Sequence, residues 1–89
     1  RQGQSCTAAS RIFVHESIFD SFLEGLKAKL NELKIGDPMD METDVGSVIS
    51  PAQHQKILSY VDIGKKTPGA TAHECSALPT DPKLSKGLF

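Results

Sequence analysis

The chain of 89 residues contains no tryptophan, only two cysteines and no excess of charge of either sign. Two cysteines cannot form the disulfide framework of a small secreted domain, so we expect a reducing, cytoplasmic setting. The 10 basic and 11 acidic side chains nearly balance, which argues against nucleic acid or an anionic membrane surface as a partner. No apolar run approaches the roughly 20 residues that span a bilayer, so we expect no membrane partner.

The sequence also lacks an initiator methionine and any phosphate-binding glycine motif. It opens on Arg1, from which we expect processing, excision or truncation. Neither a G-x-G-x-x-G fingerprint nor a phosphate-cradling lysine loop is present, so the chain carries no dinucleotide-binding motif of its own. Its length allows one small domain or a piece of a larger one.

Two segments have the three-and-four spacing of apolar residues that is typical of amphipathic helices. The first covers residues 17–33 and the second covers residues 51–65. Ser50 is the predicted N-cap of the second helix, Pro51 fits its first helical position, and Gln53 would complete a capping box. The sequence therefore predicts two helices that each have one apolar face.

Short runs of β-branched and aromatic residues predict strands around these helices. The run "RIFVH" (Arg11–His15) predicts a short buried strand, the region after the Pro68-Gly69 turn predicts another, and the final "LF" predicts the start of a third. Residues 3–9 are expected to form a tight turn followed by a short helix of small residues. The alternation favours an α/β fold, with short parallel strands and two covering helices, as an incomplete unit.

The residues around Cys6 suit a reactive cysteine. In "GQSCTAASR" (residues 3–11), Gly3 allows a sharp turn, and the small residues after Cys6 would let a helix start pack closely. Unpaired backbone N–H groups at a helix start favour a thiolate and can hold a developing oxyanion. The alternative is a buried cysteine that acts as a small hydrophobic residue. This stretch alone leaves both interpretations open.

Other groupings of reactive side chains carry less information. A hydrolase with a Cys–His pair would need a histidine beside Cys6, and His15, His54 and His73 are candidates by residue type only. Cys6, His73 and Cys75 are too few and too scattered for the paired spacing of a zinc site, so we expect no metal.

Five segments, in order along the chain, resemble the NAD(P)-dependent aldehyde dehydrogenase family. The stretch "GQSCTAASR" resembles its active-site signature, Gly-Gln-x-Cys followed by small residues. Later segments resemble its strand and helix after the nucleophile, its Gly-Asp-Pro loop, its next helix and its Lys-Gly-Tyr-Phe strand entry: "SRIFVHESIFDSFLEGL", "LKIGDPMDMETDVGSVIS", "QHQKILSYVDIGKKTPGA" and "KGLF". The resemblance covers essentially the whole chain.

The resemblance implies roles for five residues. Cys6 would be the catalytic nucleophile that attacks an aldehyde carbonyl, and its backbone N–H would be one oxyanion donor. Ser5 and Thr7 would line the substrate tunnel. Gln53 and Lys56 would be cofactor-binding residues, for NAD or NADP. Local roles stay open for both, as part of the helix cap for Gln53 and on a solvated helix face for Lys56.

Several parts of the family pattern have no counterpart here. They are the general-base glutamate, the asparagine oxyanion donor and the dinucleotide-binding domain. The resemblance therefore implies that residues 1–89 are a fragment of the catalytic domain that oxidises no aldehyde alone. Its partners would be an aldehyde substrate and the remainder of the parent polypeptide, with the parent forming a homo-dimer or homo-tetramer. The sequence departs from the family pattern at "GSV" (residues 46–48) and over residues 71–84, where a Gly-Gly turn is lacking.

A second hypothesis, of a different class, is a stand-alone interaction or thiol-redox module built from the same segment. The two hypotheses predict different surfaces. An exposed apolar surface far above a few hundred Å² would indicate missing neighbours, whereas a compact and fully covered core would favour the module.

Overall fold

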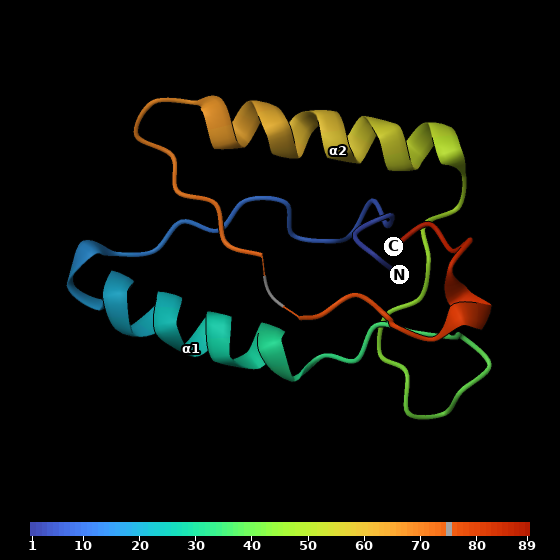
Figure 1. The fold of residues 1–89 in the computed structure, drawn as a ribbon. Coiled ribbons are helices and arrows are strands. Elements are labelled where there is room, and N and C mark those ends of the chain that lie inside the picture. Colours follow the sequence, from blue (N-terminus) through green and yellow to red (C-terminus); the bar gives the residue numbers. More distant parts are fainter. Residues whose placement is uncertain (75) are drawn as a thin grey trace.

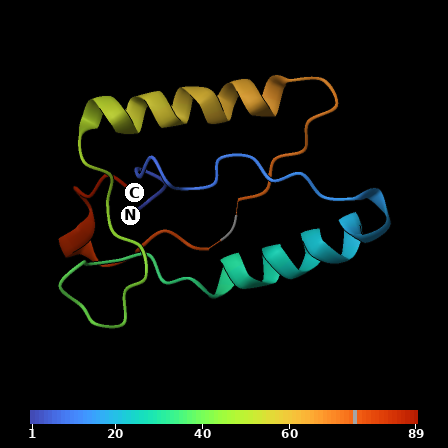
Figure 2. The same ribbon diagram turned by 180° about the vertical axis from the view of Figure 1, so that it is seen from behind.

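The computed structural model describes residues 1–74 and 76–89, and the regular structure within them is helical (Figure 1). In chain order the elements are η1 (Glu16–Ile18), α1 (Phe19–Glu32), α2 (Pro51–Lys66) and η2 (Pro82–Leu84), where η denotes a 3-10 helix. Helices α1 and α2 lie on opposite sides of the non-helical chain in Figure 1 and in the reverse view of Figure 2, and they do not pack against each other. No helix of the described residues has the length and apolar character needed to cross a membrane.

Helix α1 follows η1 directly, and the start of this helical segment is capped by His15. The Ser17 N–H donates a hydrogen bond to His15 Nδ1 at 3.1 Å, so His15 supplies the cap. Asp20 in the first turn of α1 and Lys29 in its last turn complement the helix dipole. The helix predicted over residues 17–33 is confirmed, since η1 and α1 together cover residues 16–32.

Helix α2 begins where its capping residues predict. The Gln53 N–H donates to Ser50 Oγ at 3.2 Å, and Pro51 occupies the first turn, where its missing N–H is not needed. The other half of a capping box, a bond from the Gln53 side chain back to Ser50, is not among the hydrogen bonds of the described residues. The helix ends at Lys66, one residue beyond its predicted end. Lys65 and Lys66 lie in its last turn, where their positive charges interact favourably with the negative end of the helix dipole.

The predicted α/β fold with short parallel strands is wrong for the described residues. They contain no strand, and their one β-contact is an isolated parallel bridge between Ile35 and Val45. Residues 11–15, predicted as a buried strand, make no hydrogen-bond ladder, and Phe13 is 93% exposed. A β-branched and aromatic run becomes a strand only where a neighbouring strand completes the ladder, and no described segment lies in that position.

The other two predicted strands and the short helix over residues 3–9 are also not found in the described part of the chain. At the final "LF", Leu88 makes one cross-chain contact, in which its carbonyl accepts the Val48 N–H at 2.8 Å. At the other end of the chain, Gln2 and Gly3 have φ angles of 55° and 69°, which a right-handed helix excludes. The residues after them form turns.

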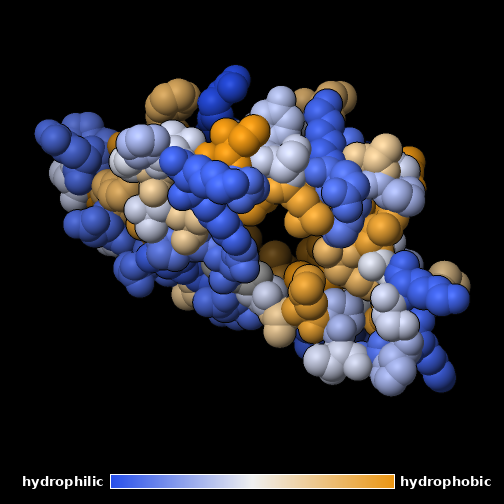
Figure 3. Space-filling view, turned by 45° about the horizontal axis from the view of Figure 1, so that its top comes forward, coloured by the Kyte–Doolittle hydropathy of each residue, from blue (hydrophilic) through white to orange (hydrophobic). Residues whose placement is uncertain are grey.

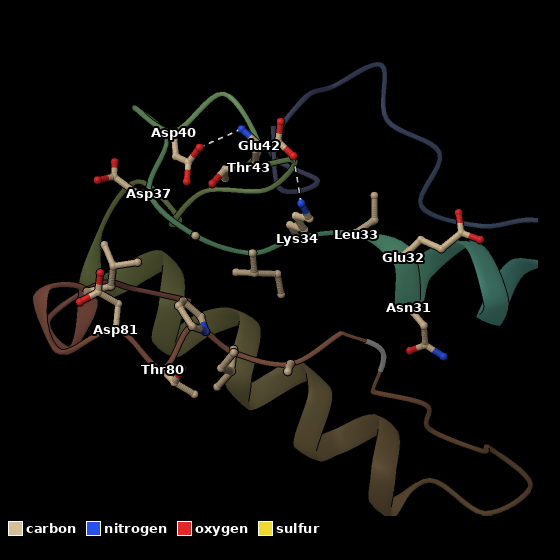
Figure 4. Close-up of a pocket in the computed structure, with 16 residues that line it drawn as sticks. Asn31, Glu32, Leu33, Lys34, Asp37, Asp40, Glu42, Thr43, Thr80 and Asp81 are labelled. Atoms are coloured by element: carbon tan, nitrogen blue, oxygen red, sulfur yellow. Dashed lines mark hydrogen bonds and ion pairs between the residues drawn. The ribbon is translucent and has the colours of Figure 1, made fainter.

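The loop between the helices (residues 33–50) contains four acidic side chains, Asp37, Asp40, Glu42 and Asp44, and is called the acidic loop below. Hydrogen bonds close its base. The Val45 N–H donates to the Lys34 carbonyl and the Gly36 N–H donates to the Val45 carbonyl, each at 3.0 Å. Across the loop, Lys34 Nζ donates to a Glu42 carboxylate oxygen at 3.1 Å (Figure 4). This hydrogen bond and the charge of Glu42 raise the pKa of Lys34. The loop is therefore held by its own polar groups.

No hydrophobic side chain of the described residues is fully buried. They expose 7615 Å², whereas a compact protein of this mass exposes about 5,100 Å². The radius of gyration is 14.7 Å, against about 12 Å for a compact chain of this length. Figure 3 shows a hollow bordered by hydrophobic surface, and a cavity of about 310 Å³ has a largely apolar lining that includes Ile35, Leu58, Val61, Leu78 and Phe89. The core of the described residues is thus incomplete.

We predict that the 89-residue chain alone unfolds without a cooperative transition. Its helices have 14 and 16 residues, and isolated helices of about 12–15 residues are only marginally stable in water. Circular dichroism at 222 nm against urea should therefore give a broad, shallow change, and calorimetry should give no unfolding peak.

A variant in which one helix is strengthened but no core is added tests the same prediction. Gly64→Ala in α2 should raise the helical signal, because the added Cβ would meet no atom within 4 Å beyond the adjacent backbone of its own helix, and alanine favours the helix by about 1 kcal/mol. It should not sharpen the transition. A single steep sigmoidal transition in the unsubstituted chain would contradict the incomplete core.

Glu74 and Lys65 link the end of α2 to the chain that follows it. Lys65 Nζ donates to a carboxylate oxygen of Glu74. This hydrogen bond and the lysine charge lower the pKa of Glu74. Because this pKa is lowered in the folded state, the pair contributes to stability above the ordinary pKa of glutamate. The contribution is lost as the pH falls through the lowered value.

Lys65→Met should return the pKa of Glu74 to the ordinary range of a glutamate, since both the hydrogen bond and the charge are removed. A carbon-13 NMR titration of the Glu74 carboxyl group measures this change. Lys66→Met is the control, because Lys66 Nζ donates to Asp62 Oδ2 at 2.7 Å and does not bind Glu74. An identical Glu74 titration in both variants would show that Lys65 does not hold this carboxylate.

Candidate active site

Cys6 lies in the second of two consecutive turns at the start of the chain. In the first turn, the Gln4 N–H donates to the Arg1 carbonyl at 2.9 Å, across Gln2 and Gly3. Positive φ angles at both central residues are the signature of a type I′ turn. A left-handed conformation is unusual for a non-glycine residue such as Gln2, whereas Gly3 adopts it without steric conflict.

The second turn places the Cys6 side chain at the surface. The Ala8 N–H donates to the Ser5 carbonyl at 3.0 Å, so that Cys6 and Thr7 are its central residues. Cys6 is an exposed free cysteine, and a helix does not start there. Both local interpretations of this residue, a buried hydrophobic thiol and a thiol at a helix start, are therefore wrong for the described structure.

Ser5 and Thr7 flank Cys6 and bind each other. Their hydroxyl oxygens are 2.8 Å apart, and the Thr7 N–H lies 3.4 Å from Ser5 Oγ. The Cys6 N–H, in contrast, donates to no group of the described residues. The turn thus presents a thiol and a free backbone N–H donor side by side.

The turn formed by residues 5–8, called the Cys6 turn below, is connected to a distant part of the chain through the residue before it, Gln4. Gln4 Oε1 accepts the N–H of Ile49 at 3.1 Å, across 45 residues of sequence. The preceding residue, Val48, bonds to Leu88 as described above, so residues 1–8, 46–50 and 88–89 meet at one place. Sequence reasoning assigned no function to Gln4 beyond its place in the Gly-Gln-x-Cys motif. No spacing or periodicity relates it to Ile49.

Gln53 and Lys56, the predicted cofactor-binding residues, lie in the first half of α2. Gln53 is half-buried and Lys56 is exposed. Their side chains make no hydrogen bond within the described residues, and none joins them to the Cys6 turn. Because α2 starts at Pro51, two residues after Ile49, the Gln4 contact brings the turn to the beginning of this helix, and no hydrogen bond of the described residues joins it to Gln53 or Lys56.

The histidines do not form a Cys–His pair with Cys6 in the described structure. His15 binds Ser17, and His54 Nε2 lies 3.0 Å from the carbonyl oxygen of Phe89. His73 is exposed and makes no hydrogen bond within the described residues. Cys75, the third member of the metal-binding group considered from the sequence, lies outside the described residues. Within those residues, no group of three or more His, Cys, Asp or Glu side chains could hold a metal ion.

A cavity away from the Cys6 turn is lined by none of the predicted site residues. It has a volume of about 670 Å³ and lies between the end of α1, the acidic loop and residues 77–84 (Figure 4). Acidic side chains dominate its charged lining, with one lysine among them: Glu32, Asp37, Asp40, Glu42, Asp81 and Lys34. Lys34 and Glu42 point toward each other there, so the carboxylate of Glu42 balances the positive charge of Lys34.

Comparison with known proteins assigns the chain to a family along its whole length. A sequence model described as the aldehyde dehydrogenase family matches residues 1–89. Aldehyde dehydrogenase citD of Monascus ruber is 41% identical over 88 residues, which cover 99% of this chain and 17% of that protein. Betaine aldehyde dehydrogenase of Vibrio vulnificus (strain YJ016) is 39% identical over 88 residues, with 99% and 18% covered. An aldehyde dehydrogenase of Agaricus bisporus is 44% identical over 71 residues, with 80% and 14% covered.

The chain spans about 17% of the length of the first of these relatives. No solved structure matches the fold of the described chain. The match therefore rests on sequence, and it relates this chain to a part of a longer protein.

Proposed function

Because the chain belongs to the aldehyde dehydrogenase family, we propose that residues 1–89 form the nucleophile-bearing part of an NAD(P)-dependent enzyme that oxidises an aldehyde to a carboxylic acid. The observation that carries this proposal is the Cys6 turn. It combines an exposed thiol with a backbone N–H that no described group accepts. These are the two groups that covalent attack on a carbonyl requires from one residue.

In the proposed reaction, the Cys6 thiolate attacks the aldehyde carbon and forms a carbon–sulfur bond. The carbonyl electron pair moves to oxygen, where the Cys6 N–H stabilises it, and a thiohemiacetal results. A bound NAD or NADP would supply the hydride acceptor, so that loss of the aldehyde hydrogen as a hydride would leave a thioester on Cys6. Water then attacks the thioester, releases the carboxylic acid and returns the thiol. Ser5 and Thr7, next to Cys6, would line the path by which the aldehyde enters.

Gln53 and Lys56 are the residues of this chain that we propose to contact the cofactor. Their side chains are free of hydrogen bonds within the described residues. An amide and an ammonium group can bind the ribose hydroxyls and the phosphates of a dinucleotide. The chemical class of these side chains thus fits NAD or NADP.

The remainder of a longer polypeptide is the proposed partner of these residues. Two observations support it: the described residues have no buried apolar side chain, and the chain spans about 17% of its relatives. The alternative of a stand-alone interaction or thiol-redox module would need a covered core, which the described residues lack. A cytoplasmic location and a homo-dimeric or homo-tetrameric parent belong to the same proposal.

Cys6→Ser in the full-length polypeptide should abolish aldehyde oxidation, because a serine hydroxyl is a far weaker nucleophile than a thiolate at neutral pH. We expect a loss on the order of a thousandfold or more, measured as NADH or NADPH formation with a panel of aldehydes. Cofactor binding, measured by fluorescence titration, should survive. Cys75→Ser is the control and should retain turnover. Normal turnover in Cys6→Ser would refute the nucleophile assignment.

The 89-residue chain alone should form no measurable NADH or NADPH from any aldehyde. It has one proposed oxyanion donor, and the family's general base and dinucleotide-binding domain have no counterpart in it. The assay is cofactor absorbance at 340 nm with the purified chain and with its Cys6→Ser variant. Cofactor reduction that disappears in the Cys6→Ser variant would contradict this prediction.

A further inference from the structure

We propose that Gln4 is a positioning residue for Cys6, which acts by holding the Cys6 turn against the segment that leads into α2. The inference rests on the proposed role of Cys6 as the nucleophile. Gln4 does not touch the substrate or the reacting atoms in this proposal. Its side chain accepts the Ile49 N–H, and that bond sets where the turn lies.

Gln4 lies at the junction of the two turns, two residues before the nucleophile. Its backbone N–H closes the first turn on the Arg1 carbonyl at 2.9 Å, and its carbonyl leads directly into Ser5, the first residue of the second turn. Its side chain is bound at the same time to Ile49 at 3.1 Å. Because its main chain and its side chain are both hydrogen-bonded, Gln4 links the position of Cys6 to the position of residues 46–50.

The segment that receives Gln4 is itself held by two further polar contacts. The Val48 N–H donates to the Leu88 carbonyl at 2.8 Å, and Ser50 caps α2. Packing does not hold Ile49 in place, because Ile49 is 85% exposed. The hydrogen bond from its N–H to Gln4 is therefore what joins Ile49 to the start of the chain.

The Gln2 side chain lies beside the same contact. Its amide lies 3.1 Å from Gln4 Nε2 and 3.1 Å from the Gly46 backbone nitrogen. With the amide oxygen toward Gly46, it accepts the Gly46 N–H, and the amide nitrogen donates to the Arg1 carbonyl at 3.1 Å. A Cβ at position 46 would lie 3.6 Å from this amide, so the side chain covers the Gly46 backbone closely. Beyond these glutamine contacts, no hydrogen bond joins residues 1–8 to a distant segment of the described chain.

Loss of the Gln4 contact should reduce the catalytic step and leave substrate binding nearly unchanged. Misplacement of a reacting group by about 1 Å lowers the rate on the order of a hundredfold. In the full-length polypeptide we expect Gln4→Met to lower kcat by about 10- to 100-fold. The KM values for aldehyde and cofactor should stay within about twofold, since the binding groups are not changed.

Two further variants separate positioning from a general loss of stability. Gln4→Glu keeps an acceptor oxygen at the same distance and should restore most of kcat. Its negative charge near Cys6 disfavours the thiolate, so the pH–rate profile should shift to higher pH, and the plateau values of kcat are compared. Gln4→Asn keeps the amide but is one methylene too short to reach Ile49. It should behave like Gln4→Met.

The outcomes decide between the claims. A kcat for Gln4→Met equal to that of the unsubstituted enzyme, with Cys6→Ser inactive, overturns the positioning role and leaves the proposed function standing. Normal turnover in Cys6→Ser overturns the proposed function itself. A lower melting temperature for Gln4→Met with unchanged kcat per folded molecule assigns Gln4 a structural role only and also overturns the inference. If Gln4→Met does not fold, a plateau kcat for Gln4→Glu no higher than that for Gln4→Asn overturns it.

Discussion

The described structure depends on backbone hydrogen bonds and helix caps, because its two helices share no buried core. Within each helix the backbone N–H and C=O groups bond to one another. Polar side chains cap the helix starts: Ser50 caps α2, and His15 caps η1, which continues into α1. The apolar faces that usually stabilise such helices are only partly covered. What joins distant parts of the chain is a small number of polar contacts, among them Val48 to Leu88 and Ile49 to Gln4.

This arrangement has a direct consequence for the proposed chemistry. A nucleophile in an exposed turn is accessible, but accessibility alone does not orient it. In the described chain Cys6 lies in the second of two consecutive turns, and Gln4, at their junction, accepts the Ile49 N–H; we propose that this bond orients Cys6. The thiol and its neighbouring N–H are thus present locally, and in the proposed function the walls of a substrate site and the remaining catalytic groups would come from other parts of a longer polypeptide.

Sequence patterns predicted the parts of the fold that are determined locally. The apolar spacing over residues 17–33 and the Ser50–Pro51 start signal placed both helices close to their observed ends, because periodicity and capping act within a few residues. The strand predicted over Arg11–His15 was wrong, because a strand depends on a partner segment that composition does not reveal. The contact between Gln4 and Ile49 could not be predicted, since the two residues are 45 positions apart. The motif around Cys6 identified the family but not the exposed turn.

The central claim, that Cys6 carries the substrate covalently in an aldehyde oxidation, is tested most directly by mass spectrometry of an acid-quenched reaction. The full-length polypeptide is mixed with aldehyde and oxidised cofactor, quenched during turnover and digested at low pH, which preserves thioesters. The account predicts an added acyl mass on the peptide that contains Cys6, and its loss after treatment with hydroxylamine. An acyl group on a different residue, or steady turnover with no acylated Cys6 peptide, would contradict the account.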